Sequence, residues 1–238
     1  MTHPGNHDLA FPPLMWGEET RDDAFDHALM RATLGCEAGL VSYRLAPDVL
    51  QGALVLAPEV PLSHAMAMLP LCGIGLQNAL GVLAPPEVAV HLEWSGAIRI
   101  NGARCGAFRA VAATGDAAAI PDWLVVGFSL PLLPATDRPG DTPDETALFA
   151  EGCADVSPPA LIEAWARHSL NWIARWEQSG SRALHEEWRG LAHGIGEDIT
   201  ISRETGTFVG IDEDFSLLLR QGEATRPIPL TSLLEPAP

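Results

Sequence analysis

Residues 88–111, VAVHLEWSGAIRINGARCGAFRAV, decide the fold of this chain. In the first seven of them, apolar and polar side chains alternate, which is typical of a strand with one buried face. Asn101-Gly102 is the strongest short signal for a β-hairpin, because both turn positions need a positive φ. The apolar run at residues 123–133 predicts a further strand that is buried on both faces. The sequence therefore predicts a sheet that contains this hairpin.

Helices are expected around the sheet. The spacing of apolar residues predicts them at residues 18–35, at residues 62–83 and in a segment that begins at Pro158. Pro70 and the pair Gly73/Gly75 are expected to break or kink the second of these helices. The third carries several tryptophans on one stripe, and packing in the core is the favoured interpretation of them.

Residues 196–235 differ from the rest of the chain in the pattern of their predicted strands and turns. Short strand-like runs there are separated by turn-forming clusters, a spacing that indicates a small all-β barrel of the SH3-like type. We therefore divide the chain into a larger domain at residues 1–183 and a small barrel domain at residues 184–238.

The charged residues are unbalanced. The chain has 31 acidic and 14 basic residues, a net charge of −17, and every basic residue is an arginine. Without lysine there is no P-loop lysine, no Schiff base and no lysine general base. The arginines form no basic run, so we expect neither nucleic acid nor an anionic membrane as a partner. We also expect every apolar stretch to be shorter than the ~20 residues of a membrane span.

The cellular compartment is predicted from the cysteines and the first residues. The four cysteines lie far apart without a Cys-x-x-Cys pair, which indicates reduced thiols. The first residues lack the basic and apolar parts of a signal peptide. Both observations favour a cytoplasmic protein.

Several short motifs are explained better by structure than by function. Residues 72–78 contain part of a glycine-rich dinucleotide fingerprint, but no clear strand precedes them. The acidic run at residues 212–214 lacks the further ligands of a calcium loop, and the histidines form no zinc motif. We expect no metal site built from these residues.

Two thiols are considered as nucleophiles. Cys105 follows Arg104, and a neighbouring guanidinium can lower a thiol pKa, although a buried structural cysteine is the favoured interpretation. Cys153 lies between a loop and a helix N-terminus, where the helix dipole favours a thiolate. Cys153 is therefore the better candidate of the two.

The order of these features resembles the core of the biotin/lipoate protein ligase family. A helix LPLCGIGLQNALGVL leads into the strand VAVHLEW, the hairpin AIRINGARCGAF and the strand WLVVGFSLPL. Residues 184–189, LHEEWR, and 209–214, VGIDED, are similar to the small C-terminal barrel of biotin protein ligases. The resemblance spans residues 18–235. It implies an α+β fold: a class II synthetase-like mixed sheet with helices, followed by the SH3-like barrel.

The resemblance also implies a site. In the family, one strand ends in Lys-Trp-Pro-Asn-Asp, and a Lys-x-x-Gly segment of the next hairpin carries the catalytic lysine. The lysine position, ten residues after the retained Trp94, is Arg104 here. Arg104 is therefore expected to bind the acid or stabilise the adenylate. Arg44 is what remains of the family's Gly-Arg-Gly-Arg stretch, and we expect it to bind substrate together with Trp94, Gly106 and Gly127.

An active member of this family would use ATP and Mg²⁺ to join a biotin- or lipoate-like acid to AMP, and would then pass the acyl group to a lysine of a carrier protein. The missing lysine and arginine-rich loop imply altered or reduced activity. Two alternatives stay open: a non-catalytic module that binds a small acid or a carrier protein, and an octanoyl-type acyltransferase that uses Cys153. A homodimer is a further expectation from the family. No winged-helix domain precedes the core, so the DNA-binding form of the family is not implied.

Overall fold

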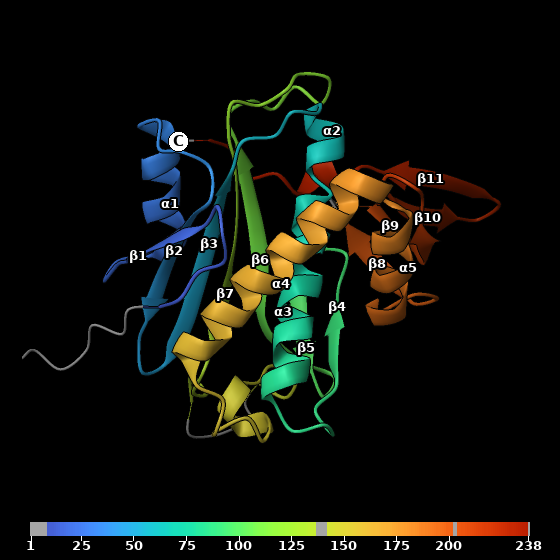
Figure 1. Cartoon of the computed structure of the whole chain (residues 1–238). Helices are drawn as coiled ribbons and strands as arrows, with labels where there is room; N and C mark the ends of the chain where they lie inside the picture. Colours follow the sequence, from blue (N-terminus) through green and yellow to red (C-terminus); the bar gives the residue numbers. More distant parts are fainter. Residues whose placement is uncertain (1–8, 137–141, 202–203, 238) are drawn as a thin grey trace, which may run out of the picture.

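The computed structural model describes residues 9–136, 142–201 and 204–237, and it contains two sheets (Figure 1). The larger sheet has seven strands in the order β1-β2-β3-β7-β6-β5-β4. β1 and β2 are parallel, and all other neighbours are antiparallel, which confirms the expected mixed sheet. The strands are β1 (Trp16–Glu19), β2 (Leu40–Leu45), β3 (Val49–Leu56), β4 (Val90–Leu92), β5 (Ala97–Ile100), β6 (Ala103–Ala112) and β7 (Leu124–Pro131).

The β5–β6 hairpin forms at the predicted place. Asn101 and Gly102 have φ values of 51° and 95°, as a type I′ turn requires. The register between β5 and β6 then shifts within the hairpin. Beside this shift, Gly106 has a φ of 94°, and a Cβ atom there would lie 2.0 Å from the carbonyl oxygen of Ser129. Only glycine fits this position without displacing the neighbouring strand.

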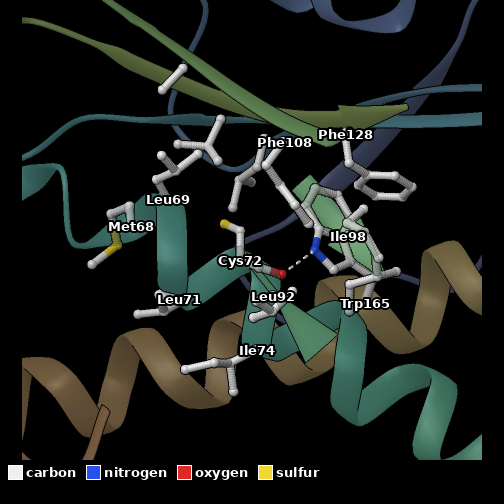
Figure 2. Packing of buried hydrophobic residues seen from close by; sticks show 14 of the residues in the cluster. Met68, Leu69, Leu71, Cys72, Ile74, Leu92, Ile98, Phe108, Phe128 and Trp165 are labelled. Carbon is white, nitrogen blue, oxygen red and sulfur yellow. Dashed lines mark hydrogen bonds between the residues drawn. The ribbon is translucent and has the colours of Figure 1, made fainter. Parts of the chain in front are cut away.

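Helices lie on both faces of the larger sheet (Figure 1). α1 (Ala24–Thr33) packs on one face, while α3 (Met68–Leu83) and α4 (Pro158–Ser179) pack together on the other. Trp165 of α4 is fully buried, and its Nε1 donates a hydrogen bond of 3.1 Å to the carbonyl oxygen of Cys72 in α3 (Figure 2). Core packing is therefore the role of this tryptophan, as expected.

The segment before α1 corrects the expectation of one helix over residues 18–35. Trp16–Glu19 pairs with β2 as a parallel edge strand, and the helix begins only at Ala24. The Asp23 carboxylate caps this helix by accepting the backbone N–H groups of Phe25 and Asp26. Parallel pairing with a distant strand leaves no helical or alternating signal in four residues, which explains the wrong assignment.

The region 62–83 is broken, but not where its glycines suggested. A short helix, α2 (Leu62–Ala65), ends before α3 begins at Met68. Pro70 lies in the first turn of α3, where its missing N–H group is not needed. The glycines do not interrupt α3. A Cβ atom on Gly75 would lie 2.5 Å from Ser169 Oγ, so the absence of a side chain lets α4 approach closely.

Leu62–Leu83 is also the one stretch of the described chain that is long and apolar enough to cross a membrane, with 22 residues. The expectation that every apolar stretch is shorter than a span is therefore wrong. Within the fold, 72% of its most apolar window is buried inside the protein, which is the environment of a core helix.

The smaller sheet follows α5 (Arg182–Leu191) and has the order β11-β10-β9-β8, with antiparallel neighbours throughout. Its strands are β8 (Asp198–Ile201), β9 (Glu204–Ile211), β10 (Leu217–Gln221) and β11 (Ala224–Ile228). They lie close to the predicted strand-like runs. Closure into an SH3-like barrel and a boundary between residues 183 and 184 stay predictions.

The smaller sheet is attached directly to the larger one. Trp94, just after β4, donates a 2.8 Å hydrogen bond from Nε1 to the carbonyl oxygen of Phe215. Leu92 of β4 pairs with Ala192 in a parallel bridge. After β11, a short 3-10 helix (Leu230–Leu233) leads the chain back to the larger sheet, where the candidate site lies.

Candidate functional site

A cavity of about 360 Å³ lies on the face of the larger sheet that α1 covers in part. We call it the sheet cavity. Strand pairing brings residues of β2, β3, β7 and β6 into two adjacent rows on this face. The rows are Arg44, Gln51, Ser129 and Ala107, and Ser42, Ala53, Gly127 and Arg109. The residues that line the sheet cavity are Asp23, Phe25, Gln51, Gly106, Ala107, Phe108, Arg109, Phe128, Ser129, Pro131 and Glu235.

Arg109 is the one basic residue among the described residues that line the sheet cavity. Its Nη2 donates hydrogen bonds to Asp23 Oδ1 at 2.8 Å and to Asp26 Oδ1 at 3.2 Å. Its guanidinium lies 4.1 Å from the centre of the Phe25 ring. Its Nη1 lies 3.7 Å from Glu235 Oε2. Because three carboxylates share one cation, an anionic ligand that binds Arg109 must displace one of them.

The remaining walls combine one amide with apolar surface. Gln51 Nε2 donates to Asp23 Oδ2 at 2.8 Å, and Gln51 Oε1 accepts the backbone N–H of Ala24 at 3.2 Å. These bonds hold the amide in one orientation at the N-terminus of α1. Phe25, Ala107 and Pro131 supply the apolar side chains on this face, whereas the rings of Phe108 and Phe128 point to the opposite face of the sheet, where Phe128 contacts Trp165. An apolar wall with a few fixed polar groups at one end is the usual form of a small-molecule site.

A second cavity, of about 330 Å³, lies between the hairpin and the smaller sheet. We call it the intersheet cavity. Two arginines and one glutamate of the hairpin region form its polar wall. Glu93 Oε1 accepts from Arg99 Nε at 2.6 Å and from Arg104 Nε at 2.9 Å, and Glu93 Oε2 accepts from Arg104 Nη2 at 2.7 Å. Arg104 is therefore bound in a bidentate ion pair at the cavity wall, with about half of its side chain exposed.

The ion pairs change the pKa of their members. Partial burial raises the pKa of Glu93, but the hydrogen bonds from Arg104 and Arg99 and their charges outweigh burial, so the pKa lies below its usual value. The hydrogen bond to Glu93 and the charge of Glu93 raise the pKa of Arg104. Arg104 is thus a cation that shares the single negative charge of Glu93 with Arg99.

The expected site residues do not meet in one place. Trp94 and Arg104 both line the intersheet cavity, whereas Gly106 lines the sheet cavity. Arg44 lies opposite Gln51 in the same face as the sheet cavity. Gly127 lies beneath α1, since a Cβ atom there would be 2.7 Å from the Phe25 ring.

The two thiols are buried, and neither has the lowered pKa expected of a nucleophile. Burial raises the pKa of Cys105 to about 12, with further contributions from the charge of Glu151 and from Cys153. Burial and Glu151 also raise the pKa of Cys153, which is fully buried after the 3-10 helix Leu148–Glu151. The helix that begins at Pro158 does not compensate for this desolvation.

The β2–β3 connection is a tight turn. Leu45 pairs with Leu50, and the backbone N–H of Ala46 donates to the carbonyl oxygen of Val49 at 3.1 Å. This is the place where the resemblance puts the family's arginine-rich stretch. The turn is too short to extend over the sheet cavity, so the cover over a bound acid has to come from another part of the chain.

A comparison with protein-family profiles shows to which family this chain belongs. The profile of the biotin/lipoate A/B protein ligase family matches residues 11–190, which is most of the chain. The chain belongs to this family. A second profile, a domain of unknown function (DUF4444), matches residues 195–236, which include the smaller sheet. Among curated proteins, none matches the sequence.

Solved structures of ligase-like proteins share the fold. A biotin protein ligase-like protein of unknown function from Silicibacter sp. TM1040 is 61% identical, with a TM-score of 0.91 over 96% of this chain and 100% of that chain. The biotin protein ligase of Aquifex aeolicus gives a TM-score of 0.73 at 14% identity, over 92% and 96% of the two chains. The Leishmania major biotin protein ligase in complex with biotinyl-5-AMP gives 0.57 at 17% identity, over 91% and 99%. At these identities the two ligases establish the fold alone.

Sequence reasoning did not find the residues that dominate both cavities. Arg109 lies among mostly apolar residues of strand β6. A charged side chain on the inward-facing side of a strand was the signal from which Arg109 could have been predicted as a site residue. Asp23 and Gln51 carried no signal of their own, because their contacts come from elements 28 residues apart. Glu93 was visible at the strand end beside Trp94, but its pairing with Arg104 depends on the hairpin register.

Proposed function

We propose that this member of the ligase family binds a small carboxylic acid with an apolar body, similar in kind to biotin or lipoate, in the sheet cavity. The observation that carries this proposal is the single guanidinium of Arg109 at the polar end of a partly apolar cavity. A volume of about 360 Å³ lies within the range of small-molecule sites. The ligand carboxylate takes the place of Asp26 or Glu235 beside Arg109, and the apolar body lies against Ala107 and Pro131.

The relatives support this class of ligand. The Aquifex aeolicus ligase has been solved in complex with biotin and ATP, and the Leishmania major ligase in complex with biotinyl-5-AMP. Biotin carries a carboxyl group on a largely apolar body, and biotinyl-5-AMP is the adenylate of that carboxyl group. The chemistry of the sheet cavity in this chain favours the acid, since its one cation matches one carboxylate.

Acyl-adenylate formation is the second candidate, and membership of the family favours it. In that reaction a carboxylate oxygen attacks the α-phosphorus of ATP, and pyrophosphate leaves. The site must neutralise the phosphates as charge develops. Here Glu93 balances only one of the two charges of Arg99 and Arg104, whereas Arg109, the one cation among the described residues that line the sheet cavity, is already shared by three carboxylates.

The sheet cavity therefore offers one shared guanidinium, which fits a single carboxylate better than a triphosphate. Binding without ligation is the function that the geometry supports best. Acyl transfer through Cys153 is less favoured, because the thiol is buried and its pKa is raised.

Isothermal titration calorimetry with biotin, lipoate and octanoate tests the binding proposal. Because a hydrogen bond to a charged group contributes about 1.5–3 kcal/mol, Arg109→Gln is expected to weaken acid binding by about tenfold or more. Octanamide, which lacks the charge, should bind both proteins equally. Arg220→Gln, on the exposed end of β10, is the matched control and should bind the acids like the wild type. Equal acid affinity in the Arg109→Gln protein, or no binding of any acid, contradicts the proposal.

Pyrophosphate release separates binding from ligation. The protein is incubated with ATP, Mg²⁺ and each acid, with and without a lysine-bearing carrier domain. We expect acid binding without pyrophosphate release. Release that depends on the acid would replace the binding proposal by the ligase alternative.

A further inference from the structure

The segment that follows the smaller sheet returns to the sheet cavity. Leu230 is buried where the chain leaves β11. Leu234 then pairs with Ala110 of β6 in a parallel bridge, and the backbone N–H of Glu235 donates to the carbonyl oxygen of Ala110 at 2.9 Å. β5 is paired with β6 only as far as Ala107, so this segment occupies the edge of β6 that β5 leaves free. It joins the two sheets next to the cavity.

The side chain of Glu235 enters the wall of the sheet cavity. Its carboxylate is 46% exposed and lies 3.7 Å from Arg109 Nη1. Asp23 and Asp26, the other two partners of Arg109, are fixed by the first turn of α1 and approach to 2.8 and 3.2 Å. Glu235 is held less firmly, since one bridge and one backbone hydrogen bond attach its segment to β6. Glu235, which lies farthest from Arg109, and Asp26, whose side chain is 70% exposed, are therefore easier for a ligand to displace than Asp23.

We propose that Leu234–Glu235 is a displaceable strap whose Glu235 carboxylate occupies the position of the ligand carboxylate beside Arg109. The strap lowers the affinity for anionic ligands, because the ligand must compete with an internal carboxylate for one guanidinium. A neutral ligand does not meet this competition. This inference rests on the proposed acid-binding function. It adds that the Glu235 carboxylate competes with the bound acid for Arg109.

Octanoate and octanamide titrations of three proteins test the strap: the full chain, Glu235→Gln, and a chain from which residues 234–238 are deleted. An exposed ion pair contributes enough for Glu235→Gln to tighten octanoate binding about two- to fivefold at low salt, with no change for octanamide. The gain should shrink at about 0.5 M NaCl, where screening is stronger. The deletion should give at least the same gain. Glu223→Gln, in the exposed turn between β10 and β11, is the matched control and should leave both affinities unchanged.

The outcomes distinguish the strap from the binding site. If octanoate binds the full chain and Glu235→Gln with equal affinity, the strap is overturned and the acid-binding proposal stands. If octanoate binds none of the proteins, both are overturned. Tighter octanoate binding by Glu235→Gln and by the deletion, with unchanged octanamide binding, supports both. The point substitution keeps the test valid even if the deleted chain does not fold.

Discussion

Replacing Glu93 by glutamine tests whether one carboxylate anchors the two arginines of the intersheet cavity. The Glu93 side chain is 13% exposed and accepts hydrogen bonds of 2.6 Å from Arg99 and of 2.9 and 2.7 Å from Arg104. Glutamine has nearly the same shape, but it carries no charge, and its NH₂ group faces other donors. We expect Glu93→Gln to lower the free energy of unfolding.

The size of this loss follows from how exposed each partner is. Arg99 is 18% exposed, and a hydrogen bond between charged groups in such a place contributes about 1.5–3 kcal/mol. Arg104 is 53% exposed, so its pair with Glu93 contributes only about 0.2–1 kcal/mol. Glutamine keeps one acceptor oxygen and recovers part of the sum. The expected loss is about 2 kcal/mol at pH 7.

The loss should depend on pH in a defined direction. The folded protein lowers the pKa of Glu93 below its usual value of 4.5. Its contribution to stability is therefore fully present above the usual pKa and is lost as the pH falls through the folded-state pKa. The difference between the wild type and Glu93→Gln should be largest near neutral pH and should shrink below about pH 4.

Urea unfolding followed by circular dichroism measures these differences. The matched control is Glu186→Gln, which removes the partner of Arg182 in a pair whose side chains are 64% and 89% exposed. That substitution should change the free energy by less than about 0.5 kcal/mol. If Glu93→Gln costs no more than the control, or if its effect grows on acidification, the anchoring role of Glu93 is refuted.

Three further predictions concern the contacts around the two cavities. Trp94→Phe removes the hydrogen bond to the Phe215 carbonyl and should cost about 1–2 kcal/mol in the same urea assay, because it leaves a buried carbonyl unpaired. Gly106→Ala should cost at least about 2 kcal/mol, since alanine disfavours a φ of 94° and its Cβ would meet the Ser129 carbonyl; a stability equal to the wild type would contradict the geometry. Iodoacetamide should label only the partly exposed Cys36 in the native protein and all four thiols in urea, as read by mass spectrometry; native labelling of Cys153 would count against its burial.

The strands and most helices were predicted because their signals are local. Asn101-Gly102 selects a turn through the φ values of two adjacent residues, and the hairpin formed where expected. The edge strand Trp16–Glu19 was missed because its partner, β2, lies 24 residues further along the chain. The break before α3 was placed too late, since a proline in the first turn of a helix is tolerated.

The candidate site was predicted less well, for a physical reason. The resemblance placed Arg104 and Gly106 on the right strand, but it could not show that they line different cavities. The ion pair of Arg109 with Asp23 joins residues 86 positions apart, and it exists only after α1 has packed on the sheet. No periodicity in the sequence reports such a contact. The raised thiol pKa values likewise follow from burial, which the local sequence around Cys153 did not reveal.

The sequence by itself determined the hairpin, the alternation of the strands, the family resemblance and the absence of lysine, because each depends on residue types within a short segment. Only the tertiary structure decided which partners Arg104 and Arg109 have. It pairs Arg104 with Glu93 and places Arg109 at the end of a partly apolar cavity. It also brings Glu235 against Arg109. The Arg104–Glu93 pair depends on the register of one hairpin, whereas the contacts of Arg109 join elements that are far apart in the chain and are fixed only when the helix and the C-terminal segment pack on the sheet.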